Sequence, residues 1–337
     1  MKYDNLDVIV PTYNRAKYLR TCLTALCESV AEPRKVIVLN NASTDNTIDV
    51  VNEICLEYPD RNIEVITNPK NLGNAGNFIK TQEIANNEYV AIFHDDDAVH
   101  PEYIARAMKV MTEDKTLVLC TGGGEPMFNV NHDNFPMLPN TFFYYPKNFN
   151  VFLQLCVGRH TFFSAIYKTD AYKSIKYNPK KYGKLHDIVF LMDVASLGDS
   201  VMLQGCCIRW RQSLLQDSSD LKSGPFKNEI IGIIKYMKNQ YMKEISNEKK
   251  SKKAFDFCFR ILLYNFSYFI YDWSKISRFT PWENFKKELQ KNGIFEKTDF
   301  DEFELYIDST LNPFVINFAK VMREKYTKTY KYRLGFN

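Results

Sequence analysis

Short apolar runs alternate with helix-like stretches through roughly the first 120 residues, and this alternation limits the fold more than any other feature of the sequence. Between the runs, apolar residues recur at helical spacing. Strands that alternate with helices are typical of parallel strands joined by crossover helices. The pattern predicts an α/β fold with a mostly parallel central sheet flanked by helices. The expected strands are Leu6–Val10, Lys35–Leu39, Asn62–Thr67, Tyr89–Phe93 and Thr116–Cys120.

Polar loops follow these strands at their carboxyl ends. They read PTYNR, NNASTDNT, NPKNLGNAGN and HDDDAVHP. In an open α/β sheet, ligands bind in the crevice outside the carboxyl ends of the strands. We therefore expect these loops to converge on one site.

The remainder of the chain is less regular. Residues 121–146 are rich in Gly, Pro and Asn and predict a long loop region. A helix is expected over 188–195, with Gly198 at its end and a returning strand over 201–203. We expect one α/β catalytic domain over 1–220, with halves of about 1–120 and 121–220, followed by a mainly helical appendage over 221–337.

Composition sets only broad limits on partners. With 337 residues and 45% apolar content, the chain can bury a core, and its net charge of +4 favours neither nucleic acid nor a membrane as a general partner. The part after Pro225 is basic, with six basic residues and one acid from Lys320 onward. This end could contact anionic lipid headgroups, or it could be a helix end exposed to solvent, and the sequence favours neither interpretation.

Cysteine usage and hydropathy favour a cytoplasmic protein. The eight cysteines form no C-x-x-C pair and predict reduced, buried thiols. The chain enters its first strand without a charged and apolar leader, so no signal peptide is expected. The apolar stretch over 255–273 is interrupted by charges and falls short of the ~18 residues that a spanning helix needs.

Three adjacent carboxylates follow the apolar run that ends at Phe93. Like charges side by side repel one another unless a cation joins them. Asp95, Asp96 and Asp97 would offer hard oxygen ligands suited to Mg²⁺ or Mn²⁺ shared with a diphosphate. A helix cap is the alternative, but one Asp suffices for a cap and stabilises by only ~0.3 to 1 kcal/mol. The cluster therefore favours a metal site.

Other polar positions allow two readings each. Arg15, at the start of a helix, suits a phosphorylated ligand or an ordinary capped turn. Asp187 suits a helix cap or a general base beside His186. Four histidines, namely His94, His100, His132 and His160, have no spacing typical of a metal site and are expected to be structural or surface residues.

Taken together and in order, these segments resemble the family 2 glycosyltransferases, which have the Rossmann-like GT-A fold. The resemblance covers about residues 5–219. It rests on VIVPTYNRAKYLRTCLTAL, VIVLNNASTDNTIDVV, NPKNLGNAGNF, EYVAIFHDDDAVHPEYI (the strand carrying the D-x-D motif) and KLHDIVFLMDVASLGDSVML. The last resembles the segment that holds the catalytic base.

The resemblance implies an inverting, Mn²⁺- or Mg²⁺-dependent transfer of a sugar from a nucleotide donor, with a UDP-sugar favoured. The implied acceptor is a glycan or a lipid-linked acceptor of surface polysaccharide synthesis, such as O-antigen or capsule. Asp187 would be the base and Asp97 the first metal ligand, with Asp95 as a second. The implied nucleotide-sugar residues are Pro11, Thr12, Tyr13, Asn14, Arg15, Asn41, Asn77, Asp95 and Asp96, and weaker acceptor candidates are Arg159, His160, Thr161 and His186.

Some positions depart from the family pattern. Asn40 stands where an Asp is usual, which opens the choice of base. His186 replaces the usual Glu. Ser213 stands where a His would help to hold the diphosphate, and the residues offered as substitutes for that His are Arg209, Arg211 and Gln212. A nucleotidyltransferase, or a non-catalytic protein that binds sugar nucleotides, are the alternative functions. The first loop has few of the Gly and basic residues that a nucleotidyltransferase needs, and retention of both Asp97 and Asp187 favours an enzyme.

Overall fold

The computed structural model describes residues 1–127, 135–156, 160–162, 164–183, 186–211 and 313–331, with single residues between 232 and 291. Its strands are β1 (Lys2–Thr12), β2 (Glu32–Asn40), β3 (Ile63–Thr67), β4 (Tyr89–Phe93), β5 (Ala98–Val99), β6 (Leu117–Met127), β7 (Thr141–Tyr145), β8 (Ser164–Lys168), β9 (Asp199–Arg211) and β10 (Thr327–Thr329).

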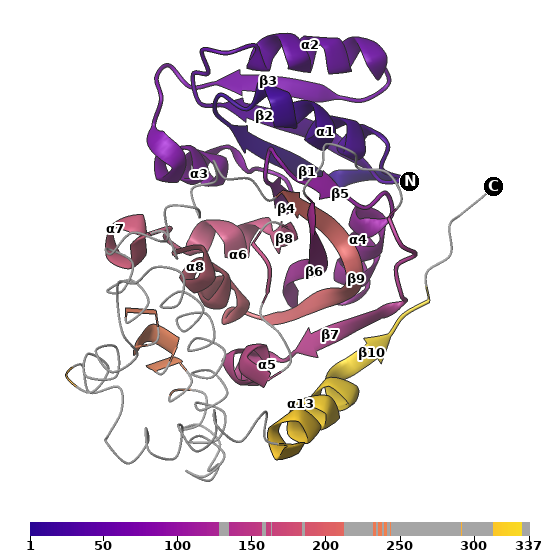
Figure 1. Cartoon of the computed structure of the whole chain (residues 1–337), viewed down its shortest axis with the longest axis vertical. Helices are drawn as coiled ribbons and strands as arrows, with labels where there is room; N and C mark the ends of the chain where they lie inside the picture. The colour runs from indigo at the N-terminus through magenta and orange to yellow at the C-terminus, as the bar shows by residue number, and fades with distance from the viewer. Residues whose placement is uncertain are drawn as a thin grey trace.

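The helices lie on both sides of one sheet (Figure 1). They are α1 (Ala16–Cys27), α2 (Thr47–Glu57), α3 (Gly73–Ile84), α4 (Tyr103–Glu113), α5 (Asn150–Cys156), α6 (Thr169–Ser174), α7 (Pro179–Tyr182), α8 (His186–Ala195) and α13 (Pro313–Tyr326), with a short 3-10 turn η1 (Lys147–Phe149). The helix expected over 188–195 is thus confirmed as α8.

The ten-stranded sheet has the order β10-β7-β9-β6-β8-β4-β1-β2-β3, and β5 pairs with β9. Strands β1 to β4 pair in parallel, as do β6 and β9. Strand β8 lies antiparallel between β4 and β6 and joins the two parallel groups. The predicted α/β fold with a mostly parallel sheet is confirmed.

Alternating residues along the central strands supply two cores. Leu6, Val8 and Val10 of β1 face one side, where they join a cluster with residues of α1, α2 and α4. Ile9 faces the other side, in a cluster with residues of α3, α6 and α8. Successive side chains of a strand point to opposite faces, so a continuous apolar run fills both cores. The carboxyl ends of these strands are left to present polar loops.

The long loop predicted over 121–146 is wrong in part, because residues 121–127 extend β6 and residues 141–145 form β7. The glycines that suggested a loop allow two strands to approach closely. A Cβ on Gly122 would lie 2.4 Å from the Cβ of Cys207, and one on Gly123 would lie 2.5 Å from the Gly205 carbonyl oxygen. Glycine marks close backbone approach here rather than a turn.

The end of the chain returns to the sheet. Strand β10 follows α13 and pairs antiparallel with β7. Tyr330 is buried next to Arg106 of α4, whose guanidinium donates to Asn140 Oδ1 at 2.6 Å. A strand here was not expected in the appendage, which was predicted to be mainly helical. Most of that appendage lies outside the described residues.

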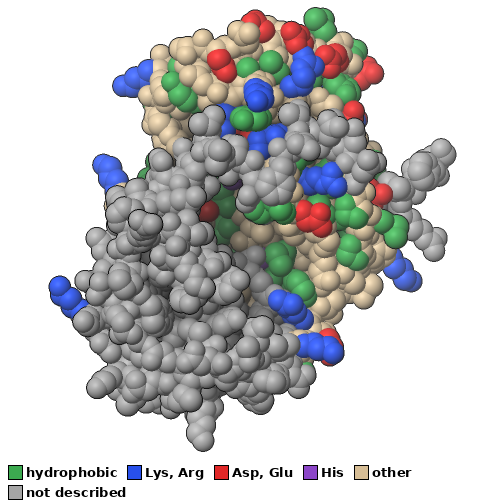
Figure 2. All heavy atoms as spheres, in the orientation of Figure 1, with side chains coloured by type: hydrophobic (Ala, Val, Ile, Leu, Met, Phe, Trp, Pro, Cys, Tyr) green, Lys and Arg blue, Asp and Glu red, His purple; other side chains and the backbone are tan. Residues whose placement is uncertain are grey.

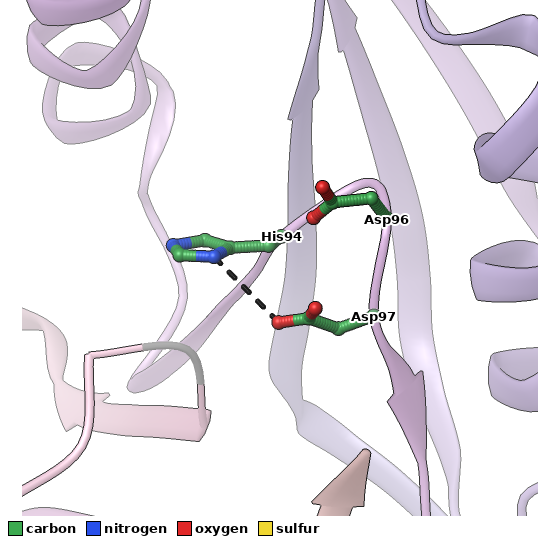
Figure 3. Close-up of side chains that lie close together, drawn as sticks. All are labelled: His94, Asp96 and Asp97. Atoms are coloured by element: carbon green, nitrogen blue, oxygen red, sulfur yellow. Dashed lines mark ion pairs between the residues drawn. The ribbon is translucent and has the colours of Figure 1, made fainter. Parts of the chain in front are cut away.

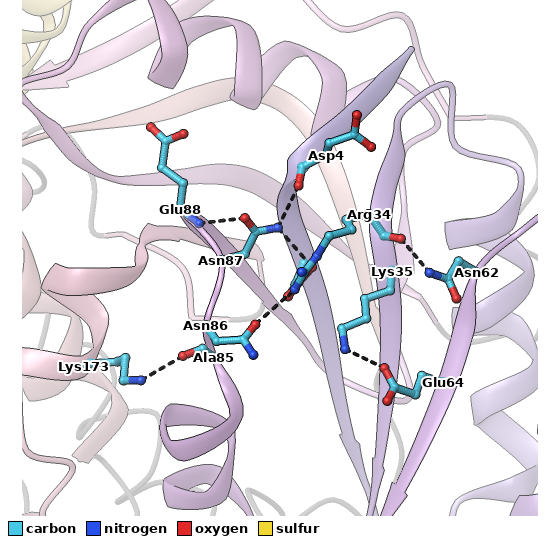
Figure 4. Close-up of polar contacts among 11 residues, drawn as sticks. Asp4, Arg34, Lys35, Asn62, Glu64, Ala85, Asn86, Asn87, Glu88 and Lys173 are labelled. Carbon is cyan, nitrogen blue, oxygen red and sulfur yellow. Dashed lines mark hydrogen bonds and ion pairs between the residues drawn. The ribbon is translucent and has the colours of Figure 1, made fainter.

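An ion pair between an exposed arginine and a buried aspartate joins the amino ends of the central strands. Asp7 of β1 is 1% exposed and accepts two hydrogen bonds from Arg34 of β2, at 2.8 and 2.5 Å. Asn86 and Asn87, in the turn before β4, contact Arg34 and Asp7. Figure 4 shows these contacts crossing from one strand to the next. At the amino ends of the strands, the negative charge of Asp7 is thus paired with the positive charge of Arg34.

Acidic and basic side chains are mixed over the surface around α2 (Figure 2). Arg20 of α1, for example, binds Glu57 of α2 at 2.8 Å. Among the helices described, none is long and apolar enough to cross a membrane.

His160 lies inside the fold rather than at its surface. Its Nδ1 lies 2.8 Å from Thr121 Oγ1 on β6, and its Nε2 lies 2.8 Å from Ser200 Oγ on β9. Desolvation by burial lowers its pKa to about 3. The neutral imidazole is therefore part of the packing between β6 and β9.

The buried state of His160 predicts a loss of stability in acid. The unfolded imidazole binds a proton below about pH 6.5, whereas the folded one does not until about pH 3, so stability is full above pH 6.5 and falls as the pH drops. The free energy of unfolding of the wild type should therefore rise more steeply with pH than that of the His160→Gln variant, by up to about 1.4 kcal/mol per pH unit. Denaturant unfolding from pH 7 to about pH 4 measures it, and equal slopes would contradict it.

Candidate active site at the carboxyl ends of the strands

Two loops are joined at the carboxyl ends of β1 and β2. The Asn14 backbone N–H donates to Ser43 Oγ at 3.0 Å, and the Thr44 N–H donates to Asn14 Oδ1 at 2.7 Å. Asn14 and Ala42 both have positive φ, 50° and 58°. Asn adopts this backbone conformation at little cost, but in Ala42 it costs of order 1 kcal/mol, and such residues concentrate at functional sites. The loop pair is therefore held in a specific, strained shape.

A network of asparagines supports the next loop. Asn41 Oδ1 accepts from Asn68 Nδ2 at 3.0 Å and from the Leu72 N–H at 2.9 Å, and Asn68 also donates to Asn77 Oδ1 at 2.9 Å. Asn41 is 2% exposed and Asn77 is 5% exposed. The sequence placed both in the nucleotide pocket. Their side-chain bonds instead favour an indirect part, in which they hold the loops after β2 and β3.

The carboxylate cluster lies in the turn directly after β4. His94, Asp96 and Asp97 bring one ligand atom each to within 4.8 Å of one another (Figure 3). Asp96 also lies 3.6 Å from the Arg15 guanidinium, which stands at the start of α1. Asp95 was predicted as a metal ligand with Asp97, but the structure groups Asp96 with Asp97 instead.

The last residue of β9 fixes the cluster from the other half of the sheet. The Arg211 backbone N–H donates to Asp97 Oδ1 at 2.9 Å, and Arg211 Nε donates to the Asp96 carbonyl oxygen at 3.0 Å. The Arg211 guanidinium also lies over the Tyr18 ring, 4.6 Å from its centroid. Arg211 therefore holds one oxygen of Asp97 and the backbone of Asp96 in place.

The acids in the turn hold protons more tightly than usual. Desolvation by burial, aided by repulsion from Asp96, raises the pKa of Asp95 to about 7. The same two causes raise the pKa of Asp97 well above its ordinary value. Desolvation lowers the pKa of His94, against the pull of Asp96 and Asp187. The site therefore carries an unfavourable concentration of negative charge that a cation would relieve.

The donor atoms present suit a divalent cation. Asp97 Oδ2 is buried and has no hydrogen-bond partner among the described residues, and it faces His94. Buried carboxylate oxygens are otherwise almost always paired. Two carboxylates and one imidazole are ligands that divalent metal ions accept.

The second half of the chain contributes Asp187, near the start of α8. Desolvation lowers the pKa of His94, and the negative charge of Asp187 opposes part of that lowering, so the two side chains share one electrostatic environment. His186 precedes it, with its ring 4.0 Å from that of Tyr177 in an edge-to-face contact. The loop after β4 and the start of α8 thus bring Asp187 close to the acidic turn.

The remaining predicted residues have varied positions. Pro11 and Thr12 end β1, and Tyr13 is 40% exposed beside them. Thr161 donates to the Gly122 carbonyl oxygen at 2.7 Å. His160 is 7% exposed, so its packing contacts leave no surface for an acceptor. Arg159 lies outside the described residues.

Sequence reasoning took His94 for a structural or surface residue, left open whether it alters how the ribose is held, and gave it no part in metal binding. The spacing His94-x-Asp96-Asp97 was the available signal, but loop residues have no fixed period from which convergence can be read. Arg211 was considered only as a substitute for a missing His. Its backbone contact with Asp97 depends on the pairing of β9 with β5 and β6, which the sequence does not specify.

Comparison with known proteins identifies the first half of the chain. Residues 7–174 match the model of glycosyl transferase family 2. The abequosyltransferase RfbV of Salmonella typhimurium is 25% identical over 273 residues, which cover 74% of this chain and 78% of that protein. EpsH of Bacillus subtilis is 27% identical over 125 residues, 37% of this chain. The match spans only 36% of EpsH, about a third of its length.

The fold is also that of a solved structure. TarS of S. aureus, residues 1–349, superposes with a TM-score of 0.58 at 18% identity, over 95% of this chain and 88% of that one. At that identity the likeness shows the fold, which supports the predicted GT-A architecture.

The crowded carboxylates predict opposite effects of one substitution on stability and on metal binding. Asp97→Asn should stabilise the cation-free protein by about 1 kcal/mol at about pH 8. The pKa of the Asp97 carboxyl group is higher in the folded protein than in the unfolded one, so the wild type loses stability as the pH rises above the pKa of the unfolded state, and Asn avoids this loss. The gain should vanish near pH 4. Urea unfolding in chelator at both pH values measures this.

The same variant should lose the stabilisation that Mn²⁺ gives to the wild type. The exposed Asp60, in the turn after α2, provides the control, since Asp60→Asn should change neither quantity. A variant that is less stable than the wild type in chelator at about pH 8 would contradict the prediction.

Proposed function

The chain belongs to glycosyltransferase family 2, and from that membership we propose that it transfers a sugar from a nucleoside-diphosphate donor to a hydroxyl group of a glycan or lipid-linked acceptor. The pathway proposed is synthesis of a bacterial surface polysaccharide such as O-antigen or capsule. RfbV, an abequosyltransferase, supports this proposal because its similarity extends over most of both chains.

One observation carries the proposal. The acidic turn after β4 and Asp187 of α8 come from different halves of the chain, yet the charge of Asp187 acts on His94 within that turn. A helix cap or an isolated acidic loop would not require this convergence. A sugar transferase requires both a site for the diphosphate and a base for the acceptor.

The donor would lie across the strand ends, between the loop that holds Arg15 and the acidic turn. Arg15 provides positive charge beside Asp96 for a diphosphate. A UDP-sugar is the favoured donor. TarS of S. aureus was solved in complex with UDP-GlcNAc. Asn40 is buried, donates to Thr67 Oγ1 at 3.3 Å and accepts from the Ser43 N–H at 3.0 Å. It would therefore shape the loop beside the nucleobase of the donor.

The transfer itself would invert the anomeric centre. Asp187 would accept the proton of the acceptor hydroxyl while that oxygen forms a bond to the anomeric carbon. The bond from that carbon to the diphosphate oxygen breaks on the opposite face, and the diphosphate leaves with the bonding electrons. A divalent cation, Mn²⁺ or Mg²⁺, held by Asp96 and Asp97, would stabilise the negative charge on the leaving diphosphate.

A panel of nucleotide sugars tests the proposal. UDP-, GDP-, CMP- and dTDP-sugars are each incubated with the protein and Mn²⁺. The amount of free nucleotide released measures the slow hydrolysis of the donor. Release of nucleoside diphosphate from one donor is expected. Hydrolysis of no donor together with no cation-dependent nucleotide binding would refute the proposal, and release of pyrophosphate from a nucleoside triphosphate in the presence of a sugar phosphate would favour a nucleotidyltransferase.

Substitution of the proposed base separates binding from chemistry. Asp187→Asn should leave donor affinity within about twofold and reduce transfer by about 10²- to 10⁴-fold, since general base catalysis contributes that much. Asp193 lies on the same helix and contacts Tyr236, so Asp193→Asn is the matched control and should keep transfer. Transfer that survives Asp187→Asn unchanged would assign the base elsewhere.

We also propose a peripheral contact between the basic end of the chain and an anionic membrane face, where lipid-linked acceptors would lie. Lys320, Arg323 and Lys325 of α13 are exposed, and each basic residue near such a surface contributes about 1 kcal/mol at low salt. Co-sedimentation with vesicles that contain phosphatidylglycerol should exceed that with phosphatidylcholine alone. The double variant Lys320→Glu and Lys325→Glu should lose the difference, and binding equal in all cases would refute the contact.

A further inference from the structure

His94 stands where the acidic turn begins, and its imidazole points to the carboxylates rather than away from them (Figure 3). An imidazole in this position could be an ion-pair partner, a hydrogen-bond donor or a metal ligand. The distances and the partners of Asp97 distinguish these roles.

The separation of the two side chains is longer than a hydrogen bond. His94 Nδ1 lies 3.6 Å from Asp97 Oδ2, whereas N–H···O hydrogen bonds have lengths of about 2.7 to 3.2 Å. Two ligands of one ion, each at about 2.0 to 2.2 Å from it, lie about 3 to 4.3 Å apart. The observed distance falls in that second range. The pair is therefore spaced to hold an ion between the nitrogen and the oxygen.

The partners of Asp97 leave one of its oxygens for this purpose. Oδ1 is held by the Arg211 backbone N–H, while Oδ2, which has no hydrogen-bond partner among the residues described, is the atom that faces His94. The Asp97 side chain is only 6% exposed, so water does not readily take the place of a partner. A carboxylate of Asp96 completes the group, with all three ligand atoms within 4.8 Å.

We propose that His94 supplies an imidazole nitrogen ligand to the divalent cation, alongside Asp96 and Asp97, and that this mixed set selects Mn²⁺ or Co²⁺ over Mg²⁺. This inference deepens the proposed function and rests on it, because the same cation would bridge to the donor diphosphate.

The selectivity follows from the ligand chemistry. Mg²⁺ prefers oxygen ligands in near-ideal octahedral geometry and gives up its water reluctantly. First-row transition ions accept imidazole readily, and their affinity for a given site rises from Mn²⁺ to Co²⁺. A cluster of carboxylates alone would serve Mg²⁺ well. Replacing one oxygen by nitrogen reduces the affinity for Mg²⁺ more than the affinity for Mn²⁺ or Co²⁺.

Pulsed electron paramagnetic resonance of Mn²⁺ bound to the full chain tests the proposal without any turnover. A nitrogen directly bonded to Mn²⁺ gives a ¹⁴N coupling, which is expected in the wild type. His94→Gln should lose this coupling and bind Mn²⁺ at least about tenfold more weakly. His100→Gln should keep both, since His100 contacts the Glu102 N–H and is not part of the cluster.

A second variant tests the selectivity. His94→Asp replaces the imidazole nitrogen by a carboxylate oxygen. The ratio of Mn²⁺ affinity to Mg²⁺ affinity should therefore be at least about tenfold lower than in the wild type. Calorimetric titration of the chelator-treated protein with each ion measures this ratio. Mn²⁺ bound without ¹⁴N coupling, no Mn²⁺ binding at all, or an unchanged ratio in His94→Asp would each overturn the proposal. The failure of the glycosyl transfer proposal is distinguishable, because it would appear as no donor hydrolysis while the ¹⁴N coupling persists.

Discussion

Mutual repulsion among the carboxylates at the end of β4 is the constraint around which the site is organised. Burial denies these groups the water that would screen them, and the pKa values of Asp95 and Asp97 rise in response. Arg15 and the Arg211 backbone N–H offset part of the charge. This crowding lowers the stability of the folded protein, and the proposed cation would recover part of that cost.

The geometry of this turn depends on both halves of the sheet. Strand β8 runs antiparallel between β4 and β6 and joins the strands β1 to β4 to the rest of the sheet. Strand β9 then returns alongside β6 and ends at Arg211. The close passage of β6 and β9 is possible because Gly122 and Gly123 leave room for Cys207 and Gly205. Two positions with no side chain thus help to place β9, whose last residue holds Asp97.

Much of the structure of the first 120 residues could be predicted from the sequence, because the parallel strands there are continuous apolar runs and their loops are polar. Repulsion among Asp95, Asp96 and Asp97 is also visible in the sequence alone. The extension of β6 and the formation of β7 could not be predicted, since glycine and proline there serve close packing and not turns. The convergence of His94 with Asp96 depends on the local path of the turn, and the role of Arg211 depends on pairing between strands distant in sequence.

The pairing of β10 with β7 has a consequence for how the protein is made. Strand β7 belongs to the central sheet, yet its outer neighbour is β10, which the ribosome adds only after the whole segment that follows β9. During synthesis the β7 edge would therefore stay open, with unpaired backbone groups that invite pairing with other nascent chains. The pairing of β10 with β7 therefore completes the sheet late in synthesis and covers an edge that was made far earlier.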